Sequence, residues 1–108
     1  MARARNAMKR VIKVDADLAD IIPDYLRNRR DELALLAGLI AAGDFDALRR
    51  IGHKMRGSGG GYGLDQLTEL GERMETSAGA GDKAALTAQA AELKEFLDCV
   101  EIEFVPGE

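Results

Sequence analysis

Four amphipathic stretches, separated by short glycine-containing breaks, constrain the fold of this chain more than any other feature. In each stretch apolar residues recur three, four and seven positions apart, the spacing of one face of an α-helix. Alternation with a period of two is nearly absent, and β-branched residues are scarce outside residues 11–14 and the C-terminal end. The pattern therefore predicts an all-α chain with four helices.

Helix boundary signals divide the stretches. The first helix is expected to begin around Pro23, because proline is tolerated in a first turn, and to end before Gly43. Asp44 and Asp82 suit the N-caps of the second and fourth helices, and the third is expected over residues 64–78. The residues expected to face the core are Ile22, Leu26, Leu33, Ala37, Ile40, Leu48, Ile51, Gly52, Met55, Leu67, Leu70, Gly71, Met74, Ala78, Leu86, Ala90, Leu93, Leu97, Val100 and Phe104.

Short connections between such helices predict an antiparallel up-down four-helix bundle with a short extra segment at its N-terminus. With 108 residues the chain suits a single domain, 1–108, in which residues 1–15 form a flexible segment and residues 101–108 a fraying tail. Leu35 and Leu39 add a second apolar edge to the first helix.

Composition excludes several classes of site. One cysteine excludes an internal disulfide and a cysteine-based zinc site, and one histidine excludes every site with two histidine ligands, so no metal is expected. Cys99, one position off its stripe, is expected to be half-buried. No stretch approaches the length of a membrane span, and residues 1–14 lack the apolar region of a signal peptide. We therefore expect a cytoplasmic protein that does not enter a membrane.

Charge is distributed unevenly along the chain. Residues 1–56 carry 12 basic and 8 acidic side chains, a net charge of +4, whereas residues 57–108 carry 3 and 11, a net charge of −8. The total of −4 argues against nucleic acid as a partner. The asymmetry has two interpretations, namely solvated helix faces of different charge or a positive patch for an acidic partner.

His53 does not belong to the apolar stripe of the second helix. At about 100° per residue it projects about 140° away from the line through Leu48, Ile51 and Met55. It is therefore either an exposed bystander or a reactive imidazole. Arg56 and Gly57, three and four residues further on, lie beside it on the same surface.

A run with five glycines in seven residues, 57–63, follows the histidine. The spacing fits neither a Walker loop nor a dinucleotide-binding fingerprint. The run is expected to end the second helix and form a tight turn in which Ser58 and Tyr62 serve as turn and packing residues.

Residues 53–58 read His-Lys-Met-Arg-Gly-Ser, Gly63 follows, and a leucine-spaced helix then leads to Glu75. This arrangement, with the four helices around it, resembles the histidine-containing phosphotransfer (Hpt) domain family. The resemblance implies that His53 is phosphorylated, that Arg56 steadies the phosphoryl oxygens, and that Gly57 admits a partner. It also implies that Glu75 orients the imidazole, although an ordinary solvent-exposed glutamate is the alternative. Arg49, Lys54 and Gly63 are the further residues expected to meet a partner.

The resemblance implies a monomeric phosphocarrier of a two-component phosphorelay, not an enzyme. It would accept a phosphoryl group from a receiver-domain aspartate and pass it to another receiver, and a hybrid sensor histidine kinase is a further possible partner. The chain itself would need no cofactor, because the receiver would bring Mg²⁺. The alternative is a helical adaptor that binds a partner through exposed apolar residues such as Leu35 and Leu39 and never carries phosphate.

Overall fold

The computed structural model describes residues 10–106, most of them in four α-helices. These are α2 (Ile22–Ala42), α3 (Phe45–Gly59), α4 (Asp65–Gly79) and α5 (Lys83–Cys99), with short 3₁₀ turns η1 (Ala16–Leu18) and η2 (Gly60–Tyr62). Two strands, β1 (Arg10–Asp15) and β2 (Val100–Val105), lie before and after the helices. In this part of the chain no helix is long and apolar enough to cross a membrane.

The predicted start and end of the first helix and the N-caps of the second and fourth helices are confirmed. Pro23 lies in the first turn of α2, and Gly43 ends that helix with a φ of 70°, a left-handed conformation that favours glycine. The side chain of Asp44 accepts a hydrogen bond from the Ala47 backbone N–H at 3.2 Å. Asp82 caps α5 in the same way. Each of these two aspartates thus satisfies a backbone N–H that its helix leaves unpaired.

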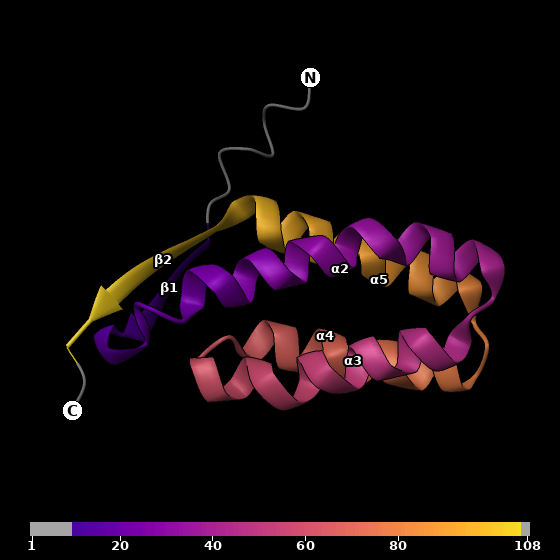
Figure 1. Cartoon of the computed structure of the whole chain (residues 1–108), viewed down its shortest axis with the longest axis horizontal. Helices are drawn as coiled ribbons and strands as arrows, with labels where there is room; N and C mark the ends of the chain where they lie inside the picture. The colour runs from indigo at the N-terminus through magenta and orange to yellow at the C-terminus, as the bar shows by residue number, and fades with distance from the viewer. Residues whose placement is uncertain (1–9, 107–108) are drawn as a thin grey trace, which may run out of the picture.

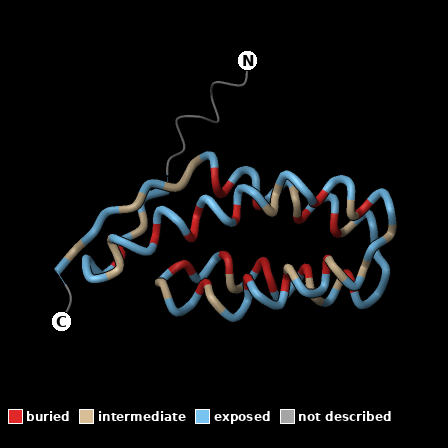
Figure 2. Tube along the Cα trace, in the orientation of Figure 1, coloured by how far each residue is buried: buried red, intermediate tan, exposed pale blue. Residues whose placement is uncertain are grey.

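The helices form two layers, with α2 and α5 in one and α3 and α4 in the other (Figure 1). Buried residues lie mainly on the facing sides of the two layers (Figure 2). The most closely packed pair is α3 and α4. Large side chains that are almost completely buried in this core are Ile22, Leu36, Leu48, Met55, Leu64, Leu67, Met74, Leu86 and Leu93.

The prediction for the inner face of α2 is confirmed at Ile22, Leu26 and Ile40, which are buried, but is wrong at Ala37. Ala37 is exposed, whereas Leu36 is completely buried. Leu33 is half-buried. Burying leucine removes more apolar surface from water than burying alanine, so the orientation with Leu36 inward is favoured. Leu35 therefore points outward, with 59% of its surface exposed.

The all-α prediction is wrong at the two ends of the chain. Residues 10–15, expected in the flexible segment, form β1, and the last helix ends at Cys99 instead of continuing toward Phe104. Residues 100–105 form β2, which pairs with β1 in parallel from Arg10 beside Val100 to Asp15 beside Val105. The β-branched residues of both segments favour strands, and Val14 is 2% exposed against the core. The other residues of the two expected segments, 1–9 and 107–108, lie outside the described range.

An ion pair joins α4 to α5. Arg73 donates two hydrogen bonds to Glu92, from Nη1 to Oε2 at 3.0 Å and from Nη2 to Oε1 at 2.7 Å. These hydrogen bonds lower the pKa of Glu92, against the opposing effect of partial burial. A carboxyl whose pKa is lowered by folding stabilises the fold above its ordinary pKa and loses that contribution as the pH falls.

We predict that Glu92→Gln lowers the free energy of unfolding by no more than about 1 kcal/mol at pH 7, because both side chains are half exposed. The difference from the unmodified chain should vanish as the pH falls through the lowered pKa of Glu92. Urea unfolding at neutral and acidic pH measures it. Glu95→Gln, on the same helix but outside this ion pair, is the control. A difference that does not depend on pH would contradict the assignment.

Candidate functional site

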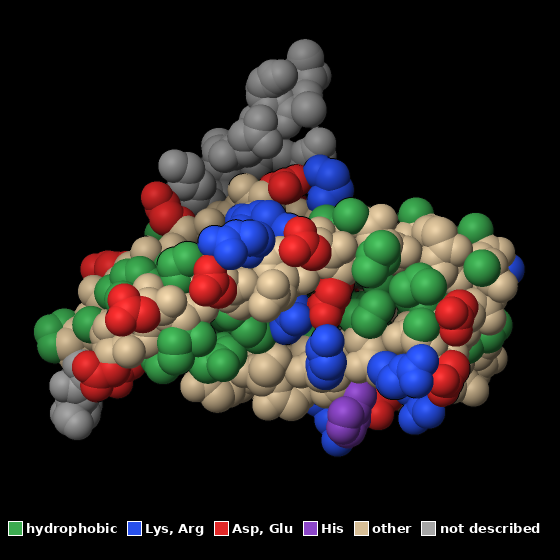
Figure 3. Space-filling view, in the orientation of Figure 1, with side chains coloured by type: hydrophobic (Ala, Val, Ile, Leu, Met, Phe, Trp, Pro, Cys, Tyr) green, Lys and Arg blue, Asp and Glu red, His purple; other side chains and the backbone are tan. Residues whose placement is uncertain are grey.

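His53 lies in the middle of α3 and points to solvent. Its side chain is 65% exposed, as its position off the apolar stripe predicts. In Figure 3 the single histidine lies at the surface among basic side chains. The imidazole is therefore accessible to a second molecule.

Two glycines bring the backbones of α3 and α4 together beside this histidine. A Cβ atom on Gly52 would lie 2.8 Å from the Gly71 carbonyl oxygen and 2.8 Å from the Glu75 backbone nitrogen. A Cβ on Gly71 would lie 2.5 Å from the Arg56 backbone nitrogen. These distances leave no room for a side chain at either position. The helices approach this closely only because both residues are glycine.

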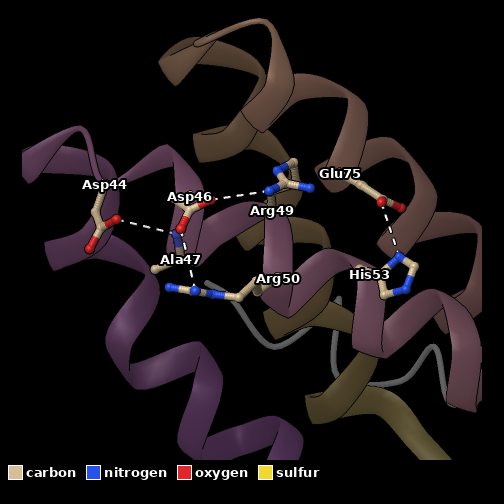
Figure 4. Close-up of polar contacts among 7 residues, drawn as sticks. All are labelled: Asp44, Asp46, Ala47, Arg49, Arg50, His53 and Glu75. Atoms are coloured by element: carbon tan, nitrogen blue, oxygen red, sulfur yellow. Dashed lines mark hydrogen bonds and ion pairs between the residues drawn. The ribbon is translucent and has the colours of Figure 1, made fainter.

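Glu75 projects from α4 toward the histidine across this contact. Its Oε2 lies 3.0 Å from Nδ1 of His53 (Figure 4). An ionised carboxylate can only accept hydrogen bonds, so Nδ1 must carry the proton. In a neutral imidazole the lone pair then belongs to Nε2. The predicted proximity of Glu75 and His53 is thus present in the structure.

Arg56 binds the same carboxylate, a contact that sequence reasoning did not foresee. Its Nη1 donates a hydrogen bond to Oε1 of Glu75 at 3.1 Å, so the two Glu75 oxygens serve the two α3 side chains separately. Arg56 is 46% exposed and Glu75 21%. The one sequence signal for this contact was that His53 and Arg56, three residues apart, lie on the same helix face. An arginine there helps to fix the carboxylate that holds the imidazole.

Gly57 differs from the packed glycines. A Cβ atom added there would meet nothing within 4 Å, although the residue lies inside α3. Glycine in a helix interior costs about 1 kcal/mol relative to alanine. No packing within the described chain explains it, in contrast to Gly52.

The other residues expected to meet a partner have contacts within the chain. Arg49 pairs with Asp46 at 3.1 Å, and Asp46 also pairs with the neighbouring Arg50 at 3.3 Å (Figure 4). Lys54 Nζ lies 3.2 Å from Glu32 Oε2 on α2. The positive patch is therefore partly balanced by acids of its own helices. Gly63 has a φ of 77°, which gives a backbone reason for glycine at that position.

Chemically, the arrangement is an exposed nucleophile with a fixed tautomer. Nε2 of the imidazole is accessible, Nδ1 faces the carboxylate of Glu75, and the Arg56 guanidinium binds that same carboxylate. Such a site can accept and release a group at Nε2. Within residues 10–106 there is no group of three or more metal-ligating side chains that could hold a metal ion.

Comparison with protein families matches residues 20–102 to the Hpt domain. The match takes in all four helices and excludes β1. No curated protein and no solved structure gives a significant match to the chain.

We predict opposite effects of alanine at two glycines of α3. Gly57→Ala should raise the free energy of unfolding by about 0.5–1 kcal/mol, since the new methyl group meets nothing. Gly52→Ala should lower it by about 1–3 kcal/mol, because the methyl group would collide with the α4 backbone. Urea denaturation measures both. If Gly57→Ala is the destabilising change, Gly57 serves the backbone and not access to the site.

Proposed function

The chain belongs to the Hpt domain family, and from this membership we propose that it carries a phosphoryl group on His53 between receiver domains in a two-component phosphorelay. The family implies phosphotransfer in two-component signalling, and Hpt domains are phosphocarriers without a catalytic site of their own. The observation that carries the assignment to His53 is its exposed imidazole, whose Nδ1 lies 3.0 Å from Glu75.

The proposed step is a nucleophilic substitution at phosphorus. The Nε2 lone pair of His53 attacks the phosphorus of an aspartyl phosphate on the receiver. The new N–P bond forms while the bond to the aspartyl oxygen breaks, and the carboxylate leaves with its electron pair. The imidazole gains positive charge, which the carboxylate of Glu75 stabilises through Nδ1–H. In the onward step an aspartate of a second receiver attacks the same phosphorus, and the N–P bond breaks as the imidazole leaves with its electron pair.

Arg56 has two contributions in this proposal. Through Nη1 it helps to fix Glu75, and its guanidinium has further N–H donors that suit phosphoryl oxygens. Its side chain is about half exposed, so an incoming phosphoryl group can reach it. Phosphoryl transfer depends mainly on positioning and charge stabilisation, which these contacts supply.

The receiver would approach over Gly57, where α3 offers open space next to the histidine. Arg49 and Lys54 are more than half exposed and would meet its acidic pocket. Mg²⁺ would belong to that pocket and not to this chain. The short turns between the helices support an antiparallel up-down order for the bundle and a single domain.

A helical adaptor is the second candidate function, favoured by the exposure of Leu35. An adaptor would bind its partner without any change at His53. The two functions therefore differ in one observable, phosphate on the histidine.

The decisive experiment mixes the chain with a panel of purified receiver domains carrying radiolabelled aspartyl phosphate. We expect an acid-labile, base-stable label on this chain and none on His53→Gln, whose melting temperature should be unchanged because the side chain is exposed. Gly57→Gln should accept phosphate from phosphoramidate at the normal rate but from the receivers at a much lower one. Label on His53→Gln, or no transfer from any receiver, would overturn the proposal.

A further inference from the structure

The C-terminal turns of α3 are intrinsically weak. Gly57, Gly59, Gly60 and Gly61 follow one another closely, and each is a poor helix residue. The backbone nevertheless remains helical to Gly59 and continues as the 3₁₀ turn η2. Gly59 itself packs on α4, because a Cβ there would lie 2.8 Å from the Thr68 backbone nitrogen. Further contacts to this segment come from α2.

Tyr25 of α2 contacts the residues on both sides of the three successive glycines, 59–61. Its hydroxyl oxygen lies 2.8 Å from Oγ of Ser58, just before the three successive glycines. Its ring packs edge-to-face on Tyr62, just after them, with 4.7 Å between the ring centroids. One side chain of α2 thus spans the three successive glycines, 59–61.

The direction of the hydroxyl contact follows from counting protons. Ser58 Oγ donates to the Lys54 backbone carbonyl at 2.8 Å, which uses its only proton. The Tyr25 hydroxyl must therefore be the donor to Ser58. The resulting chain runs from the phenol through Ser58 to the carbonyl one turn earlier, and hydrogen bonds in such a chain strengthen one another.

Tyr25 is itself fixed by a largely buried group of charges. The Arg29 guanidinium lies 4.6 Å from the centroid of the tyrosine ring, and the residue is only 5% exposed. Arg29 pairs with Glu32, whose Oε2 also forms an ion pair with Lys54 of α3. Tyr25 as a whole is 7% exposed, so its ring cannot turn away without opening this region.

We propose that Tyr25 is a positioning residue: by bonding Ser58 and packing on Tyr62, it holds the glycine-rich end of α3 in the form over which a partner reaches His53. Lys54 and Ser58 form a stripe of α3 that contacts α2. Each directly follows a residue of the outward-facing stripe, which holds His53 and Gly57. The two stripes lie side by side on α3, so fixing one fixes the other. The functional half of this inference rests on the proposed phosphotransfer.

Amide hydrogen exchange tests the structural half. The Gly63 and Leu64 amides close the turn by bonding the carbonyls of Gly60 and Gly59, at 3.2 and 2.8 Å. In Tyr25→Phe, which keeps the ring and loses only the hydroxyl, both amides should exchange about fivefold faster, the effect of one ordinary hydrogen bond. Ser58→Ala should give the same change, and the double variant little more. Tyr62→Phe is the matched control and should leave both rates unchanged.

Phosphate transfer tests the functional half. With phosphoramidate, Tyr25→Phe should be labelled at the normal rate, whereas labelling from the best receiver of the panel should need about fivefold more receiver. Unchanged exchange at Gly63 and Leu64, or equal acceleration in α5, would overturn the local role of the hydroxyl. Faster exchange with unchanged receiver transfer would overturn its role in docking. If no receiver labels even the unmodified chain, the exchange result still stands while the proposed function fails.

Discussion

The close contact between α3 and α4 at Gly52 and Gly71 is the constraint on which the site depends. Glu75 lies one helical turn beyond Gly71, and His53 and Arg56 lie one and four residues beyond Gly52. Side chains at the two glycine positions would force the helices apart, since their Cβ atoms would come within 2.5–2.8 Å of backbone atoms. The 3.0 Å contact between Glu75 and His53 therefore requires glycine at both position 52 and position 71.

The charges around the histidine act mainly by orientation, because the site is open to water. Glu75 binds His53 with one oxygen and Arg56 with the other, and this shared use limits how the carboxylate can turn. The imidazole is thereby fixed at Nδ1 and left free at Nε2. On the α2 side, Tyr25 and Glu32 contact the next stripe of α3, so the helix that carries the histidine is fixed from two directions.

Local signals predicted the helices and the placement of the histidine, because caps and apolar spacing are properties of neighbouring residues. Gly43, Asp44 and Asp82 cap helices as predicted, and His53 points outward. The strands escaped prediction because Arg10 pairs with Val100, 90 residues away, and neither short segment shows its partner. The Arg56–Glu75 contact escaped for a related reason, since two helices must first be brought to a particular distance by their glycines.

We propose that Glu75, by holding the proton on Nδ1, leaves Nε2 of His53 as the nitrogen that accepts the phosphoryl group. Long-range proton–nitrogen NMR correlation of the chain, phosphorylated by a receiver domain and labelled with heavy nitrogen, identifies the substituted nitrogen directly. We expect a single phosphohistidine at residue 53, with phosphorus on Nε2 and a proton on Nδ1 hydrogen-bonded to Glu75. Phosphorus on Nδ1, or an unmodified His53 after transfer, would contradict it.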